Sequence, residues 1–107
     1  MNQIDVHDLA LWLADTARPA PLLLDVREPW EVQTAALNGS LNIPMQQIPA
    51  RVGEVDGARD IVAVCHHGSR SMQVAYFLER QGMARVYNLT GGIDAWSQQV
   101  DPTVPRY

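Results

Sequence analysis

The one cysteine of the chain, Cys65, is the residue best placed by its neighbours to do chemistry; it opens the segment Cys65-His66-His67-Gly68-Ser69-Arg70-Ser71. An apolar, mostly β-branched run, Ile61–Val64, precedes it and predicts a buried strand. Apolar residues at helical spacing over 71–81 predict an amphipathic helix that ends before Gly82. The cysteine is therefore expected at the carboxyl end of a strand, where open α/β sheets bind ligands.

A thiol on such a turn has the surroundings of a nucleophile. Backbone N–H groups of the turn and the positive end of the helix would face the sulfur, and both favour the thiolate. A lone cysteine is more often an inert core residue, but a core position needs no Gly, Ser and Arg after it. We predict that Cys65 is catalytic and that the residues after it form the loop that binds a substrate or an anionic sulfur: His66, His67, Gly68, Ser69 and Arg70.

Cys-x-x-Gly-x-Arg-Ser after a strand resembles the active-site loop of the rhodanese sulfurtransferases. Other blocks follow the order and spacing of that family: Leu23–Glu28 with Glu31, Gly39–Pro44, and Val86–Ile93 with Trp96. The resemblance spans nearly the whole chain. It implies one rhodanese domain over residues 1–107, with an α/β fold: a doubly wound parallel sheet of about five strands and helices on both faces.

The resemblance also implies an activity, that of a thiosulfate sulfurtransferase. Cys65 would take sulfane sulfur from thiosulfate or a similar donor and pass it as a persulfide to cyanide or a thiol, without a cofactor. A persulfide carrier that delivers sulfur to a protein acceptor is the alternative, because it needs the same loop. A non-catalytic binding module is a third reading, against which the intact loop argues.

Loop length bears on the substrate. Four residues separate Cys65 from Arg70, which suits a cradle for a single extra sulfur atom. The longer loop of related tyrosine-type phosphatases and arsenate reductases has one more residue and cradles a tetrahedral oxyanion. Arg70 itself has three readings: binding an anionic substrate, bracing the loop through backbone carbonyls, or pairing with a nearby acid. We favour the brace.

Three charged residues after the predicted strand at 22–24 would support the loop: Asp25, Arg27 and Glu31. They could be catalytic, but a buried polar brace is favoured, because buried charges need partners. Arg27 and Glu31 stand four apart and could pair. Ser69 and Ser71 are expected to cap the helix that follows the loop.

The two histidines beside the cysteine raise the question of a metal site. We predict none, because adjacent side chains diverge in a tight loop and the only other histidine, His7, is far away in sequence. His66 and His67 are expected either to line the mouth of the pocket and attract an anion, or to face solvent. The sequence favours neither reading.

Composition narrows the function classes. The chain has 107 residues, 47% of them hydrophobic, enough for the core of one domain. Its net charge of −4 and lack of a basic run argue against nucleic-acid binding. No signal peptide or membrane-length apolar run is visible, and one cysteine excludes an internal disulfide, so we expect a cytoplasmic protein. The oligomeric state is not indicated.

The remaining elements are predicted from apolar spacing and turn residues. Asp5 or Asp8 would cap a first helix that carries Leu9, Leu11, Trp12 and Leu13. A helical turn from Pro29 would point Trp30 and Val32 inward. The other expected elements are strands at 22–24 and 85–89, an extended piece at 41–44, a short helix at 45–52 interrupted at Pro49, a helix at 93–99, and an extended tail at 100–107.

Overall fold

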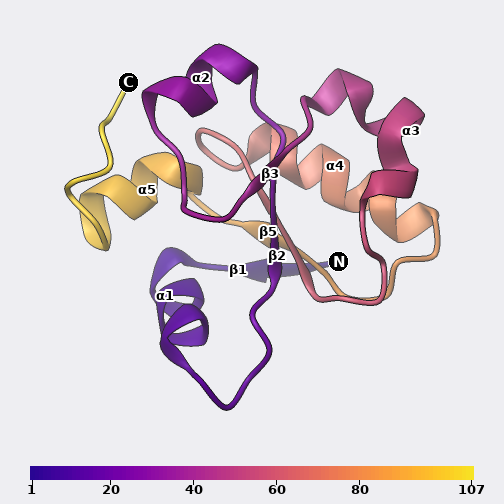
Figure 1. Cartoon of the computed structure of the whole chain (residues 1–107), viewed down its shortest axis with the longest axis horizontal. Helices are drawn as coiled ribbons and strands as arrows, with labels where there is room; N and C mark the ends of the chain where they lie inside the picture. The colour runs from indigo at the N-terminus through magenta and orange to yellow at the C-terminus, as the bar shows by residue number, and fades with distance from the viewer.

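Five short strands form one parallel sheet in the order β1-β5-β4-β2-β3 (Figure 1). The computed structural model describes residues 1–107. The strands are β1 (Asn2–Ile4), β2 (Leu22–Asp25), β3 (Leu41–Asn42), β4 (Ile61–Val64) and β5 (Val86–Leu89). The predicted parallel sheet of about five strands is confirmed, whereas β1 at the edge of the sheet was not predicted.

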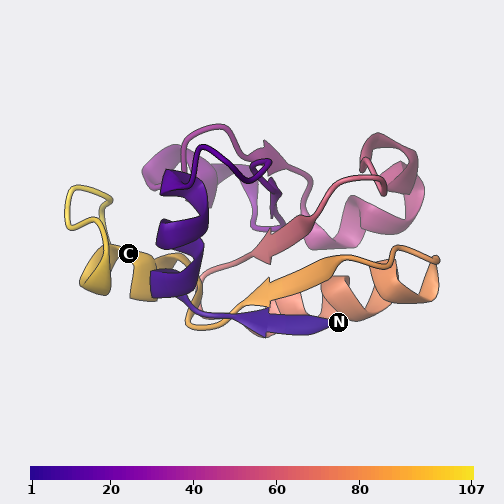
Figure 2. The same cartoon turned by 90° about the horizontal axis from the view of Figure 1, so that it is seen from below.

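Helices cover both faces of this sheet, as predicted. They are α1 (Val6–Ala14), α2 (Pro29–Thr34), α3 (Ile48–Arg51), α4 (Ser69–Arg80) and α5 (Gly92–Gln99), with 3-10 turns η1 (Met45–Gln47) and η2 (Val52–Glu54) on either side of α3. Figures 1 and 2 show α1 and α5 on one side of the strands and α3 and α4 on the other. None of these helices has the length and apolar character that a membrane span requires.

Strand β4 explains why the core forms around the loop. All four of its side chains are buried, and they alternate between two hydrophobic clusters. Ile61 and Ala63 pack with α3 and α4, whereas Val62 and Val64 pack with α1 and α5. A strand covered on both faces needs an unbroken apolar run, and each fully buried Val or Ile contributes roughly 1.5–3 kcal/mol. The carboxyl end of β4 is therefore a rigid base for Cys65.

Several predicted boundaries and orientations change in the structure. Helix α4 begins at Ser69, two positions before the predicted start. Its N-cap is Gly68, whose φ is +107°, and no side chain forms a capping hydrogen bond there. The predicted capping roles of Ser69 and Ser71 are therefore wrong. At α1, Asp5 is the cap, with its carboxylate accepting from the Asp8 N–H at 2.8 Å.

Trp30, which was predicted to point inward, lies outside, and Leu11 and Leu13 of α1 are exposed as well. Trp30 is 62% exposed, whereas Glu31 is the residue that α2 buries. The predicted helix over 45–52 is divided into η1, α3 and η2, but the predicted interruption at Pro49 is wrong. Pro49 lies in the first turn of α3, where its missing N–H costs no helical bond.

The tail, residues Val100–Tyr107, is not simply extended. It makes a turn in which the Val104 N–H donates to the Asp101 carbonyl at 3.2 Å, and Val104 packs on the α1/α5 cluster. The chain then runs back toward α2, where it ends in Figure 1. The tail therefore returns to the edge of the sheet that carries Cys65.

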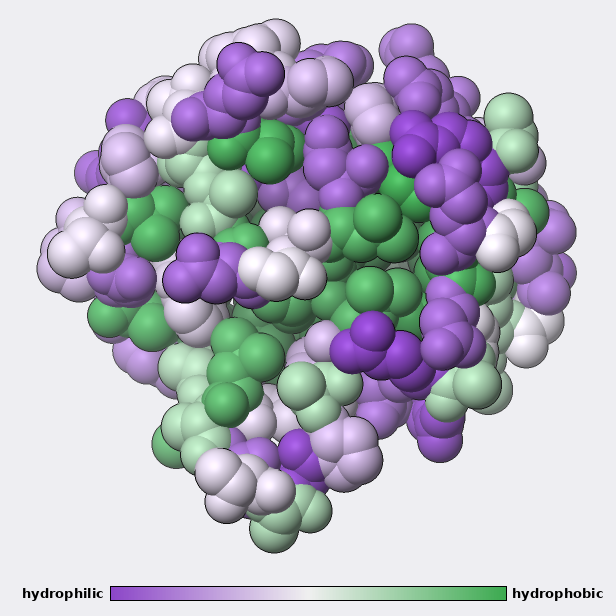
Figure 3. All heavy atoms as spheres, viewed as in Figure 1, coloured by the Kyte–Doolittle hydropathy of each residue, from purple (hydrophilic) through white to green (hydrophobic).

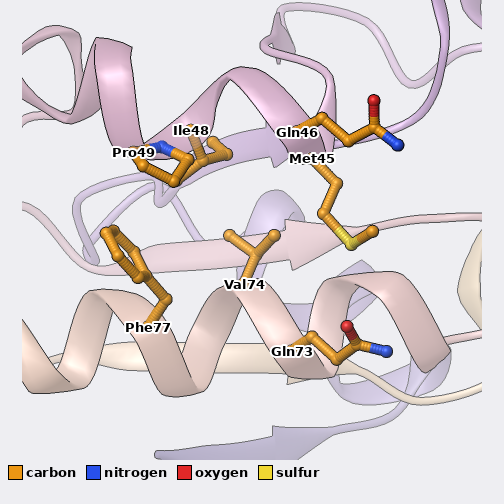
Figure 4. Close-up of a pocket in the computed structure, with 7 residues that line it drawn as sticks. All are labelled: Met45, Gln46, Ile48, Pro49, Gln73, Val74 and Phe77. Atoms are coloured by element: carbon orange, nitrogen blue, oxygen red, sulfur yellow. The ribbon is translucent and has the colours of Figure 1, made fainter.

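A hydrophobic groove of about 250 Å³ lies between the η1/α3 segment and α4. Figure 3 shows hydrophobic residues gathered on this face, and Figure 4 shows the side chains of the two segments facing each other across the groove. Its lining is Met45, Gln46, Ile48, Pro49, Gln73, Val74 and Phe77. None of these residues belongs to the Cys65 loop, residues 65–71, but Ile48 and Val74 share a hydrophobic cluster with Cys65.

Candidate active site

Cys65 directly follows β4, and its side chain turns into the start of α4. The residue is only 1% exposed. Its Sγ accepts a hydrogen bond from the Gly68 N–H at 3.1 Å and lies 3.2 Å from the Ser71 hydroxyl oxygen. The sulfur thus sits at the N-terminal end of a twelve-residue helix, with the Gly68 N–H directed at it.

Helix α5 holds the carbonyl side of the same loop. The Ile93 N–H donates to the Cys65 carbonyl at 2.9 Å, and the Asp94 N–H donates to the His66 carbonyl at 3.1 Å. This contact requires Gly92, since a Cβ there would lie 2.4 Å from the His66 carbonyl oxygen and 2.5 Å from that of Cys65. With its carbonyls held by α5, the loop has its N–H groups free to face the sulfur.

Ser71 and Asn88 are site residues that the sequence did not reveal. The buried Ser71 hydroxyl donates to the Asn88 Oδ1 at 2.5 Å while lying beside the sulfur. Asn88 is on β5, the strand next to β4 in the sheet, and its amide donates to Gln3 on β1 at 2.9 Å. The signal available in the sequence was a polar residue within an otherwise apolar strand.

Arg70 pairs with an acid and donates to no backbone carbonyl, so the favoured prediction of a brace through carbonyls is wrong. Its guanidinium donates to both carboxylate oxygens of Glu31, at 2.7 and 2.9 Å. Arg70 therefore lowers the pKa of Glu31 to about 2, and Glu31 in turn raises the pKa of Arg70. Arg70 stands five positions after Cys65, so its positive charge belongs to the same loop as the sulfur.

Arg27, which is fully buried, pairs with Asp25 and not with the side chain of Glu31 as predicted. Its guanidinium donates to Asp25 at 2.9 and 2.6 Å and to the Ala35 carbonyl at 2.6 Å. Burial opposes this charge, but the bonds to Asp25 and Tyr107 hold the pKa of Arg27 above its usual value. No group of this pair contacts Cys65, so the geometry is that of a brace.

Tyr107 of the tail joins the two ion pairs. Its hydroxyl accepts from Arg27 Nη1 at 2.9 Å and donates to Glu31 Oε2 at 2.7 Å. Burial raises the pKa of Tyr107 to about 12, with the bond to Glu31 acting in the same direction. The sequence could not indicate this contact, because no spacing rule connects residue 107 with residues 27 and 31.

The rings of His66 and His67 stack with centroids 4.0 Å apart, so these adjacent side chains do not diverge as expected. His66 also stacks on Tyr107, its Nε2 is buried without a partner, and burial followed by the charge of His67 lowers its pKa. His67 is exposed, with its Nε2 3.6 Å from Asp94. The two histidines thus divide between the predicted positions: His66 within the site, His67 toward solvent.

Nitrogens of both histidines and an oxygen of Asp94 lie within 4.8 Å of one another, a spacing from which a metal site can be considered. The carboxylate of Asp94 already accepts from Arg106 at 3.0 Å and from Gln98 at 2.8 Å. Its charge is therefore committed to a cation of the protein itself.

The remaining loop residue, Ser69, is exposed in the first turn of α4.

The chain is similar to known proteins over most of its length. The profile of the rhodanese-like domain matches residues 6–99. A sulfurtransferase of Allochromatium vinosum is 41% identical over 104 residues, which is 97% of this chain and 95% of that protein. The thiosulfate sulfurtransferase GlpE of Shewanella oneidensis is 32% identical over 76 residues, 71% of this chain and 75% of that protein.

Solved structures agree with the sequence relatives. A rhodanese-like domain protein of Staphylococcus aureus superposes with a TM-score of 0.84 at 27% identity, covering 100% of this chain and 99% of that one. A rhodanese-related protein of Thermoplasma volcanium gives 0.84 at 27% identity, covering 94% of both chains. The chain belongs to the rhodanese-like domain family, which confirms the resemblance seen in its sequence.

Proposed function

We propose that this protein is a sulfurtransferase that carries sulfane sulfur as a persulfide on Cys65. The observation that supports this most is the placement of Cys65 Sγ at the start of α4, where it accepts a hydrogen bond from the Gly68 N–H at 3.1 Å. Relatives named as sulfurtransferases at 41% and 32% identity support the same class of reaction. Thiosulfate is the donor we propose, with cyanide or a thiol as the acceptor.

The first half-reaction is a displacement at sulfur. Cys65 loses its proton to solvent, and the thiolate attacks the outer sulfur of thiosulfate. A bond forms between Sγ and that sulfur, while the bond to the sulfonate sulfur breaks and sulfite leaves with its electron pair. The terminal sulfur of the persulfide then carries the negative charge. The Gly68 N–H, the end of α4 and the positive charge of Arg70 would stabilise it as an oxyanion hole stabilises an oxyanion.

In the second half-reaction the acceptor restores the enzyme. Cyanide attacks the terminal sulfur, thiocyanate forms, and Cys65 takes back the bonding electrons as a thiolate. These steps balance without an outside oxidant or reductant, and no cofactor is required. The four-residue gap between Cys65 and Arg70 supports sulfur over phosphate, because a short loop encloses room for one added atom.

Delivery to a protein acceptor is the second candidate. A putative sulfur carrier protein of Bacillus subtilis is 32% identical over 79 residues, covering 74% of this chain and 43% of that protein. The same Cys65 persulfide serves both readings, so they differ only in the donor and the acceptor.

Steady-state assays with a panel of donors and acceptors test the proposal. Native protein with thiosulfate and cyanide should produce thiocyanate, and Cys65→Ser should produce none while retaining its fold by circular dichroism. Turnover with cyanide or small thiols but not with protein acceptors would favour the small-molecule reading. Thiocyanate formation by pure Cys65→Ser would remove Cys65 from the mechanism.

A further inference from the structure

Tyr107 extends the site beyond the matched domain, whose profile ends at residue 99. Its hydroxyl receives a hydrogen bond from Arg27 and gives one to Glu31 Oε2, at 2.9 and 2.7 Å. The same carboxylate oxygen accepts from Arg70 Nη2 at 2.9 Å. A continuous path of hydrogen bonds thus runs from the buried brace, through Tyr107 and Glu31, to the loop that carries Cys65.

The orientation of the charged groups along this path is important, because their charges cancel. Asp25 and Glu31 are balanced by Arg27 and Arg70, each acid being ion-paired with one arginine. The group has no excess positive charge with which to attract an anionic sulfur donor. Attraction therefore depends on which charge faces the sulfur, and that charge is set by how Glu31 holds Arg70.

The ring of Tyr107 is fixed from two sides, which fixes its hydroxyl. It stacks on His66 with a centroid distance of 4.1 Å and an interplanar angle of 10°. The ring of Trp30 meets it edge-on at 5.9 Å and 76°. This contact gives the otherwise exposed Trp30 a structural role at the mouth of the site.

The rest of the tail holds Tyr107 at this position. Val104 packs on the α1/α5 cluster, and Arg106 donates to Asp94 in α5 at 3.0 Å. These two contacts, one in the final turn and one after it, limit where residue 107 can lie. The hydroxyl of Tyr107 is thus delivered to Glu31 by the fold and not by a chance surface contact.

From these contacts we infer that Tyr107 is a positioning residue of the active site: it holds the Glu31–Arg70 pair so that Arg70 presents its positive charge to an anion approaching Cys65. The inference rests on the proposed function, since the anion it concerns is the sulfur donor. Tyr107 acts through Glu31 and Arg70 and does not touch the reacting sulfur.

Two alkylating reagents of matched shape test this role without any sulfur donor. Iodoacetate is anionic and iodoacetamide is neutral, so the ratio of their rates at Cys65 reports the potential met by an approaching anion. A loss of packing or local opening changes both rates together and leaves the ratio in place. Tyr107→Phe should lower the ratio about threefold, because it removes one hydrogen bond and keeps the ring. Arg70→Ala should lower it at least as much.

Tyr76→Phe is the matched control, since Tyr76 is an exposed tyrosine on α4 whose hydroxyl makes no contact with the ion pairs. Its ratio should equal that of native protein. A Tyr107→Phe ratio equal to the native one would overturn the inference, as would an unchanged ratio in Arg70→Ala. A native Cys65 that neither reagent modifies would also overturn it, because the proposed site must admit an anion of this size.

Thiosulfate kinetics provide the second readout. Tyr107→Phe should raise KM for thiosulfate about threefold and leave kcat within about twofold, because it weakens capture of the anion and not the chemical step. A fall in kcat alone would contradict a role in anion capture. If native protein takes sulfur from no donor, the proposed function is wrong. The alkylation ratio still tests the role of Tyr107, because that experiment uses no sulfur donor.

Discussion

The hydroxyl oxygen of Ser71 lies 3.2 Å from the sulfur of Cys65, on the first turn of the helix that points at it. In the structure this hydroxyl donates to Asn88 Oδ1 at 2.5 Å, so a Cys65 thiol would have to donate to Ser71. Once the thiol loses its proton, the hydroxyl can turn from Asn88 toward the anionic sulfur. The Ser71 hydroxyl is therefore placed to donate a hydrogen bond to Sγ when the sulfur is anionic.

Ser71→Ala should slow sulfur uptake by Cys65 about tenfold, because a hydrogen bond to a charged group is worth about 1.5–3 kcal/mol. The variant also leaves the Asn88 oxygen without its donor, which should cost about 1–3 kcal/mol of stability. Stopped-flow rates of persulfide formation and urea unfolding measure the two effects. Ser97→Ala is the control, since this buried hydroxyl bonds only to the Ile93 carbonyl in α5. Equal uptake rates in the two variants would show that Ser71 does not serve the sulfur.

The Glu31–Arg70 pair predicts a pH dependence of stability. The pKa of Glu31 is lowered to about 2, chiefly by Arg70, whereas an unfolded glutamate titrates near 4.3. A folded-state pKa below the unfolded one contributes stability that is complete above about pH 4.3 and is lost as the pH falls toward about 2. Urea unfolding at pH 6, 4 and 3 should therefore show a steeper loss for native protein than for Glu31→Gln.

The matched control for this experiment is Glu54→Gln, since Glu54 also pairs with an arginine, Arg51, but on the exposed surface. Solvent and salt screen such a pair, so this variant should keep most of the acid sensitivity of native protein. Identical pH profiles for Glu31→Gln and native protein would mean that the Arg70 pair does not stabilise the fold.

The contact between α5 and the loop predicts that Gly92 is irreplaceable. An alanine there would drive its Cβ into the carbonyls of Cys65 and His66 at a φ of +60°, so the loop or the helix must shift. Gly92→Ala should lower the free energy of unfolding by about 2–4 kcal/mol and reduce sulfur transfer in the protein that remains folded. Gly53→Ala, which meets no atom within 4 Å, should change stability by less than about 0.5 kcal/mol. Comparable unfolding curves for the two variants would refute this.

Loop length gives a prediction about substrate choice. One glycine inserted after Gly68 should widen the loop and move its N–H groups away from a terminal sulfur. Sulfur transfer should fall at least about tenfold, since a displaced oxyanion-hole-type donor costs this much or more. Hydrolysis of aryl phosphates should stay negligible in both proteins, because no general acid is positioned at the sulfur. Undiminished sulfur transfer after the insertion would show that loop size does not set the chemistry.

The sequence predicted the parts of the site that depend on local patterning. The β4 run, the turn at Cys65 and the following helix were found because apolar spacing and Gly68 report on neighbouring residues. The sheet class followed from the alternation of strands and helices. The short edge strand β1 escaped, because three residues, two of them polar, leave no apolar pattern to read.

What the sequence missed depends on contacts between distant residues. Ser71 was interpreted as a cap, since its partner Asn88 comes from another strand and only the fold joins them. Trp30 was predicted to point inward, but its aromatic neighbour is Tyr107 of the tail. No local sequence rule connects these pairs, so the hydrogen bonds that hold Arg70 could be found only in the structure.

The central claim is that sulfur is carried on Cys65, and intact mass spectrometry tests it most directly. Native protein incubated with thiosulfate and freed of small molecules should gain the mass of one sulfur atom, located on the peptide that contains Cys65. The gain should disappear on treatment with cyanide and should not occur in Cys65→Ser. A native protein that gains no sulfur from thiosulfate or any other sulfane donor, or a Cys65→Ser variant that gains it equally, would contradict the account.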